Sequence, residues 1–125
     1  MTESPFQKLW YPTLDLKKST EMLIYNVTAH VEPSIEKIWL EWMEQHHIPE
    51  MHATQKFTHT KIFKIITDQD TGGISYAVQY HCENKAKLEA YLNENADQLR
   101  QSVHAKFGDQ ILFFRTELQL IQEHS

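Results

Sequence analysis

The sequence of 125 residues predicts an α+β fold, in which one four-stranded antiparallel sheet carries two helices on one of its faces. Three observations predict it. Four segments alternate apolar and polar residues with the period of a strand, and two segments repeat apolar residues with the period of a helix. These six segments follow one another in the order βαββαβ. The length leaves no room for a second core, so we expect one domain.

The first strand and the first helix lie between residues 22 and 49. Residues 22–31 (MLIYNVTAHV) are rich in β-branched and aromatic side chains, which predicts a strand. Pro33 suits the first turn of the helix that follows, because its φ angle is already helical and its missing N–H is not needed there. Pro49 interrupts the apolar stripe of that helix, so we expect the helix to end near His47. The stripe consists of Ile35, Ile38, Trp39, Trp42, Met43 and His46.

A hairpin, a second helix and a last strand follow. Residues 56–66 and 74–82 alternate as strands, and the DQDTGG composition between them favours a tight reversal. Asn84 can cap the next helix, and Gly108 can close it in a left-handed conformation. Residues 110–121 (QILFFRTELQLI) alternate again and predict the last strand.

The order βαββαβ is that of the ferredoxin-like arrangement, which puts both helices on one face of the sheet. We expect the helices to cover one set of side chains from each strand. The opposite set is too apolar for free water and too polar for a core, and sheet-to-sheet pairing of two copies explains that mixture. Beneath the helices we expect Tyr25, Val27, Tyr76, Val78, Tyr80, Phe114, Leu118 and Leu120. At the homodimer interface we expect Asn26, Gln79, His81, Phe113, Arg115 and Glu117.

Composition and charge restrict the setting and the partners. Residues 1–21 have two prolines and no sustained period, so we expect a flexible N-terminal extension before a ferredoxin-like domain of residues 22–125. The formal net charge of -5, without a cluster of Lys and Arg, argues against nucleic acid as a partner. Cys82 is the only cysteine, which favours the cytoplasm. No apolar run reaches the roughly 18 residues that a membrane-spanning helix needs, so we expect no membrane association.

His47 is the candidate catalytic residue. It lies where the first helix is expected to end, and an imidazole with an ordinary pKa of about 6.5 can act as a general base near neutral pH. The competing interpretation is that His47 only ends a helix, because the helix dipole favours a histidine at that end. The spacings of the eight histidines match no zinc motif, and neither a phosphate-binding loop nor a Gly-x-Ser-x-Gly motif occurs. We therefore expect neither a metal nor a cofactor.

Three tyrosines predict a ligand pocket under the helices. Tyr25, Tyr76 and Tyr80 should converge on the helix-facing side of the sheet and form an apolar cavity edged with hydroxyl groups. Together with Trp42 and His52 they form the expected ligand-binding set. Such a cavity suits a small apolar or aromatic ligand. Two alternatives stay open: a cofactor-free monooxygenase or isomerase with His47 as base, and a protein–protein interaction module whose aromatic core is closed.

The segments MLIYNVTAHV, WLEWMEQHHIPEM, ATQKFT, GGISYAVQY and KFGDQILFFRTEL together resemble a family of short bacterial proteins, common in Bacteroidetes, that is defined by a domain of unknown function. The resemblance covers residues 22–121 and includes the His-Ile-Pro of residues 47–49 and the Phe-Arg-Thr of residues 114–116. It implies no catalytic residue. Where the family usually has a glycine, this sequence has Gln55.

More remotely, the architecture is similar to the dimeric α/β-barrel superfamily, which includes small monooxygenases and isomerases. That resemblance implies a homodimer with a pocket between helices and sheet, and a histidine after the first helix that sometimes lines this pocket. A fold hosts many functions, so the resemblance leaves the reaction open.

Overall fold

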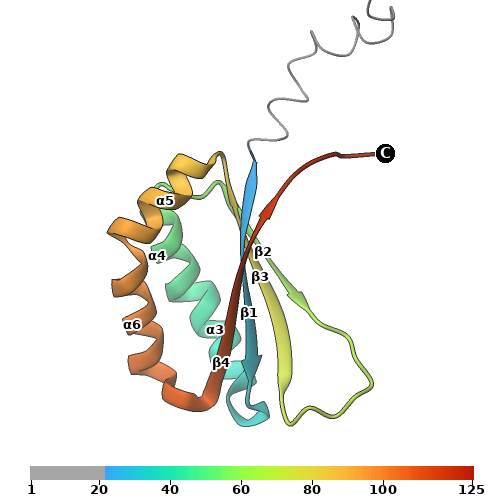
Figure 1. Cartoon of the computed structure of the whole chain (residues 1–125). Helices are drawn as coiled ribbons and strands as arrows, with labels where there is room; N and C mark the ends of the chain where they lie inside the picture. Colours follow the sequence, from blue (N-terminus) through green and yellow to red (C-terminus); the bar gives the residue numbers. More distant parts are fainter. Residues whose placement is uncertain (1–21) are drawn as a thin grey trace, which may run out of the picture.

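The computed structural model describes residues 22–125, and its helices all pack on one face of a single antiparallel sheet (Figure 1). The strands are β1 (Leu23–Val31), β2 (His59–Lys64), β3 (Ile74–Cys82) and β4 (Ile111–Gln119). They lie in the sheet in the order β2-β3-β1-β4. The predicted α+β fold of order βαββαβ is confirmed. The extension predicted for residues 1–21 lies outside the described residues.

The first helical segment runs without a break past the predicted end at His47. It consists of η1 (Pro33–Ile35), α3 (Glu36–Trp42), the π-helical turn η2 (Met43–His47) and α4 (Ile48–Ala53). In the π turn the Ile48 N–H donates to the Met43 carbonyl, five residues back, so this turn is wider than an α-helical one. The wide turn accommodates the ring of Pro49, which follows it directly in α4 and has no N–H to donate.

The second helical segment is divided in two at Asn95. It consists of α5 (Lys85–Glu94) and α6 (Ala96–Phe107), followed by the short turn η3 (Gly108–Gln110). The Asn84 cap is confirmed, because its side-chain oxygen accepts a hydrogen bond from the Lys87 N–H at 2.9 Å. Gly108 ends α6 with a positive φ of 57°, although its ψ of -131° lies outside the left-handed helical region that we expected.

The hydrophobic core fills the space between the helices and one face of the sheet, which we call the inner face. Directly opposite residues in an antiparallel pair share a face, and Tyr25 is paired with Tyr80 and Val27 with Val78. These four residues lie on the inner face as predicted, and so does Tyr76. The helices contribute Trp39, Met43, Met51, Leu88, Tyr91, Leu99, Val103 and Phe107 to the core.

Strand β4 has the opposite orientation to the one predicted. Its register pairs Arg115 with Val27, so Arg115 lies on the inner face. Phe113 and Glu117, two residues away on either side, lie there too. The prediction that these three residues face a dimer partner on the other side of the sheet is therefore wrong. The prediction gave the more apolar residues of the strand to the core, whereas the register with β1 directs that set away from the helices.

The opposite side of the sheet, which we call the outer face, is not covered by any described helix (Figure 1). Asn26, Gln79 and His81 lie on it, as predicted. Phe114 and Leu118, which we expected beneath the helices, lie on the outer face and are 63% and 43% exposed. Leu120, the third such residue, lies just beyond the end of β4. The other exposed apolar side chains of the outer face are Phe63 and Leu112.

Candidate functional site

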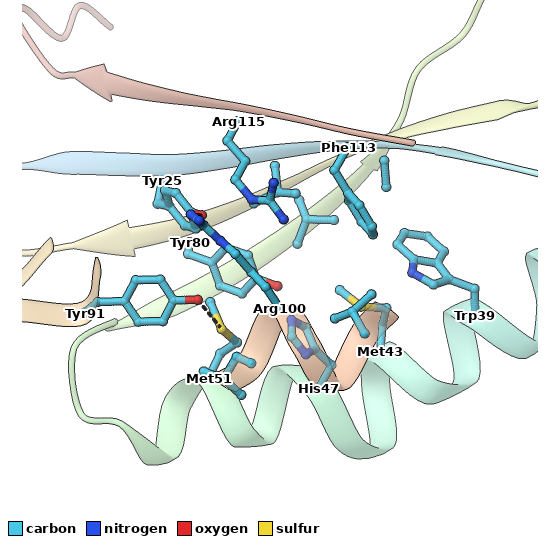
Figure 2. Close-up of a pocket in the computed structure, with 15 residues that line it drawn as sticks. Tyr25, Trp39, Met43, His47, Met51, Tyr80, Tyr91, Arg100, Phe113 and Arg115 are labelled. Carbon is cyan, nitrogen blue, oxygen red and sulfur yellow. Dashed lines mark hydrogen bonds between the residues drawn. The ribbon is translucent and has the colours of Figure 1, made fainter. Parts of the chain in front are cut away.

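A cavity of about 40 Å³ lies between the helices and the inner face of the sheet (Figure 2). A volume of this size has room for about two or three water molecules. The first helical segment forms one wall, α6 a second, and strands β1, β3 and β4 the sheet side. Six of the lining residues carry the chemistry of the site: Tyr25, Trp39, His47, Tyr80, Arg100 and Arg115.

His47 projects from the π turn into this cavity (Figure 2). Its side chain is only 8% exposed, and its ring stacks on the indole of Trp42 at 5.1 Å between centroids. Burial lowers the pKa of His47 to about 4, so the imidazole is neutral at pH 7. Its Nδ1 atom is buried without a hydrogen-bond partner in the described part of the chain.

A cluster of four aromatic rings closes the cavity at one end. Tyr25, Phe57, Tyr80 and Tyr91 contact one another with ring centroids 4.9 to 6.3 Å apart. The Tyr91 hydroxyl donates to the sulfur of Met51 at 3.3 Å. Burial raises the pKa of both Tyr80 and Tyr91, so these phenols stay protonated. This end of the site is a packed aromatic core.

Two arginines reach the cavity from different elements, Arg100 from α6 and Arg115 from β4 (Figure 2). The Arg100 guanidinium donates to the Tyr25 hydroxyl at 2.9 Å, while its Nε atom is buried without a partner. The Arg115 guanidinium lies over the ring of Phe113, 5.4 Å from its centroid. Among residues 22–125, neither arginine forms an ion pair with a carboxylate.

Unpaired polar atoms concentrate in this cavity. Within the described residues six buried side-chain nitrogen or oxygen atoms lack a hydrogen-bond partner, and three of them belong to cavity residues. These three are Nε1 of Trp39, Nδ1 of His47 and Nε of Arg100. A buried polar group without a partner costs about 1 to 3 kcal/mol. The site is therefore the part of the inner face where buried polar atoms most often lack a hydrogen-bond partner.

The structure brings together only part of the predicted site. His47, Tyr25 and Tyr80 line the cavity, but Trp42 lies behind His47 and does not reach it. Tyr76 packs against Trp39 and donates its hydroxyl to the Glu36 carboxylate. Tyr76 is four residues from Tyr80 along β3, about 13 Å away, too far to share one small cavity.

His52, the fifth expected ligand-binding residue, also lies away from the cavity. Its Nε2 is hydrogen-bonded to the Thr60 hydroxyl at 2.8 Å, which ties α4 to β2. The two arginines were missed as cavity residues. Arg100 lies four residues after Ala96 and three before Val103, so helical spacing does place it on the buried stripe of α6. Arg115 was assigned to the wrong face with the rest of β4.

The outer face carries a second set of unsatisfied polar atoms. The rings of His59 and His81 stack at 3.9 Å, and both ring nitrogens of His81 are buried without a partner in the described structure. Burial, with the nearby charges of His59 and Lys61, lowers the pKa of His81. The side-chain NH₂ group of Asn26 donates to hydroxyls of two threonines, while its oxygen lacks a partner.

The described residues contain neither a candidate metal site nor a helix suited to span a membrane. Across residues 22–125, no three His, Cys, Asp or Glu side chains lie close enough to hold a metal ion. Over the same range, no helix combines the length and the apolar character that crossing a membrane requires.

Comparisons with known proteins identify a family and relatives in fold. The model of a family described as a domain of unknown function (DUF4286) matches residues 22–121. A dimeric ferredoxin-like protein from an uncultured marine organism has a similar structure, with a TM-score of 0.67 and 10% identity over 83% of this chain and 99% of that chain. An ethyl tert-butyl ether d (ethd) family protein from Bacillus halodurans has a TM-score of 0.54 and 11% identity, over 75% of this chain and 96% of that one. At such identities the likeness establishes the fold alone. No curated protein matches the chain in sequence.

Proposed function

The chain belongs to the DUF4286 family, and we propose that this protein forms a homodimer through its outer face and binds a small, partly apolar molecule in the cavity between helices and sheet. One observation carries the proposal: half of the buried polar atoms without a partner in the described residues line this cavity. A ligand with matching polar atoms would satisfy them.

The π turn supports a binding role for His47. Single π turns inside α-helices are frequent at functional sites, because they interrupt regular hydrogen bonding to direct a side chain. Here the turn ends at His47 and directs a neutral imidazole into the cavity. A pKa of about 4 makes this imidazole a weak proton acceptor, which favours a hydrogen-bonding role over general-base catalysis in a monooxygenase or isomerase.

The size of the cavity restricts the ligand. Pockets for drug-sized molecules have volumes of about 300 Å³ or more, whereas this cavity has about 40 Å³. Met43 and Met51 line the cavity, and their unbranched side chains can change rotamer to admit a ring. We therefore expect a ligand with one small aromatic or aliphatic group, bound with movement of the methionines.

The outer face supports the dimer. Four large apolar side chains are exposed there, and unsatisfied atoms of Asn26 and His81 lie between them. Phe63 lies on the edge strand β2 and the other three on the opposite edge strand β4, and such a mixture of apolar and polar side chains suits a homodimer interface. The marine protein of similar fold is described as dimeric, which supports the same assembly here.

The ligand-binding part is tested by screening small aromatic and aliphatic compounds by NMR against the full chain and His47→Phe. We expect hits that shift the signals of His47 and Met51 in the wild type and that bind His47→Phe at least about tenfold more weakly, because one hydrogen bond to the ligand is lost. Hits that bind both proteins equally would place binding elsewhere.

The dimer is tested by sedimentation velocity with Phe114→Asp. This change puts a charge in place of the most exposed apolar side chain of β4 on the outer face, and we expect the protein to become a monomer. Ile66→Asp is the matched control, because Ile66 is 94% exposed and lies beyond the end of β2. A wild-type chain that sediments as a monomer at every concentration would refute the assembly.

A further inference from the structure

The cavity contains more hydrogen-bond donors than acceptors. Indole and guanidinium groups donate and do not accept, so the buried Trp39 Nε1 and Arg100 Nε atoms both require an acceptor. The Tyr25 hydroxyl already accepts from another nitrogen of Arg100. A ligand that fits must therefore bring acceptor atoms into the cavity.

The charge of the cavity indicates which acceptor. Arg100 and Arg115 line the same cavity and both act electrostatically on Tyr91. The acidic groups nearest to them in the chain are Asp97, on the same helix as Arg100, and Glu117, two residues from Arg115 on the inner face. In the described structure neither carboxylate comes within ion-pair distance of either guanidinium.

The two guanidinium groups differ in burial. Burial disfavours the charged form of Arg100, but the hydrogen bond to the Tyr25 hydroxyl and the electrostatic interactions with Tyr25, Tyr91 and Asp97 together outweigh it, and the pKa of Arg100 is raised. Arg115 lies at the exposed edge of the cavity, with its guanidinium over the Phe113 ring. Two positive charges without an ion-pair partner in the described structure therefore converge on a largely apolar cavity with room for only a few waters.

We propose that the cavity binds the carboxylate of a small organic acid, held between Arg100 and Arg115, with the apolar part of the acid directed toward Met43 and Met51. This inference rests on the ligand-binding site proposed above and names its chemical class. A carboxylate is an acceptor with about four lone-pair directions and matches the planar fork of a guanidinium. His47, across the cavity from Arg115 in Figure 2, is placed to hydrogen-bond a second polar atom of the acid.

The test is isothermal titration calorimetry of the full chain with benzoate and with benzamide, which has the same shape without the charge. We expect benzoate to bind at least about tenfold more tightly, because a carboxylate accepts two parallel hydrogen bonds from a guanidinium, whereas the NH₂ group of the amide donates and cannot accept. Arg115→Gln should weaken benzoate about tenfold and leave benzamide unchanged. Arg115 is exposed at one end, so this variant should fold.

Lys106→Gln is the matched control for charge. Lys106 lies on the exposed side of α6 outside the cavity, and its replacement removes the same single positive charge. We expect it to change the benzoate affinity less than twofold. If Arg115→Gln and Lys106→Gln weakened benzoate binding equally, the affinity would depend only on the net charge of the protein, and the inference would be wrong.

Three further outcomes are decisive. Equal affinity for benzoate and benzamide, or tighter binding of inorganic phosphate than of benzoate and acetate, would overturn the carboxylate assignment. So would the absence of binding by acetate, butyrate and benzoate alike. In each case the neutral compounds of the NMR screen, with His47→Phe, decide separately whether the cavity is a ligand site, so the two proposals can fail independently.

Discussion

The inner and outer faces of the sheet differ in which of their side chains lack a partner within the single chain. The inner face is closely packed except at the cavity, where it leaves donors unpaired beside two arginines. The outer face carries the more apolar residues of β4 and yet is open to solvent in the single chain. On the inner face the unpaired polar atoms lie at one cavity, whereas the exposed apolar side chains of the outer face are spread over both edge strands. The first pattern is the basis of the proposed ligand site and the second of the proposed dimer.

The largest expected effect concerns the buried histidine of the cavity. His47 has a pKa of about 4 in the folded chain and about 6.5 when unfolded. Between these values the unfolded state binds more protons, so the free energy of unfolding falls as the pH falls from 6.5 to 4, by about 3 kcal/mol. Urea denaturation across this pH range measures it.

His47→Phe isolates that contribution, because the phenyl ring does not titrate. The lowered pKa of His81 destabilises the folded chain at low pH in the same direction, and this part should persist in the variant. The difference between the two pH profiles therefore belongs to His47. Parallel profiles would mean that His47 is as accessible to protons in the folded chain as in the unfolded one.

Substituting two neighbouring phenylalanines, one on each face, compares how much each face contributes to stability. Phe113 packs against the core from the inner face, and Phe114 is exposed on the outer face. In the dilute monomer, Phe113→Ala should lower the free energy of unfolding by about 2 kcal/mol, below the 3 to 5 kcal/mol of a fully buried ring, and Phe114→Ala by less than about 0.5 kcal/mol. Chemical denaturation distinguishes them, and equal losses would contradict the observed orientation of β4.

On the outer face, one histidine has a hydrogen-bond partner and another has none, so substituting each compares the two cases. His81 has two buried nitrogens without a partner, whereas Nδ1 of His30 is hydrogen-bonded to the Ser75 hydroxyl at 2.8 Å. At pH 7 we expect His81→Leu to raise the stability of the monomer by about 1 kcal/mol and His30→Leu to lower it by a similar amount. A loss in both variants would mean that the His81 ring is held by its stacking on His59.

The smallest effect lies outside both faces, in the connection from α4 to β2. Gln55 is the only residue other than glycine with a positive φ, 63°, among those described. Gln55→Gly should raise the free energy of unfolding by about 0.5 kcal/mol, because a side chain is strained in this conformation. Ala53→Gly, in the last turn of α4, is the control and should cost about 1 kcal/mol. If both changes destabilise, the Gln55 side chain stabilises the turn by more than its strain.

The strands of the fold were predictable where local pattern and tertiary packing agree. β1 and β3 alternate strongly, and their buried residues were placed on the correct face. The two faces of β4 were exchanged in the prediction, because the more apolar side chains of this strand were assigned to the core and in fact lie on the outer face. The continuation of the first helical segment past Pro49 was missed, since a π turn has no sequence signal that distinguishes it from a helix end.

The candidate site was predictable only in part for a related reason. His47, Tyr25 and Tyr80 follow from the positions of the elements, and all three line the cavity. Arg100 was missed although helical spacing places it on the buried stripe of α6, because a long charged side chain there is usually directed to solvent. Arg115 was missed because the orientation of β4 was predicted wrongly. The same arginines give the site its charge.

The π turn has a consequence for how this chain tolerates insertions and deletions. Each residue of an α-helix turns the chain by about 100°, so a turn with one extra residue resets the phase of everything that follows. Removing one residue from Met43–His47 would remove the wide turn before Pro49 and rotate α4 about its axis by that angle. Met51 would leave Tyr91 and the wall of the cavity, while the sheet beneath would keep its register. Deleting a single residue would therefore change the lining of the cavity and leave the sheet in place.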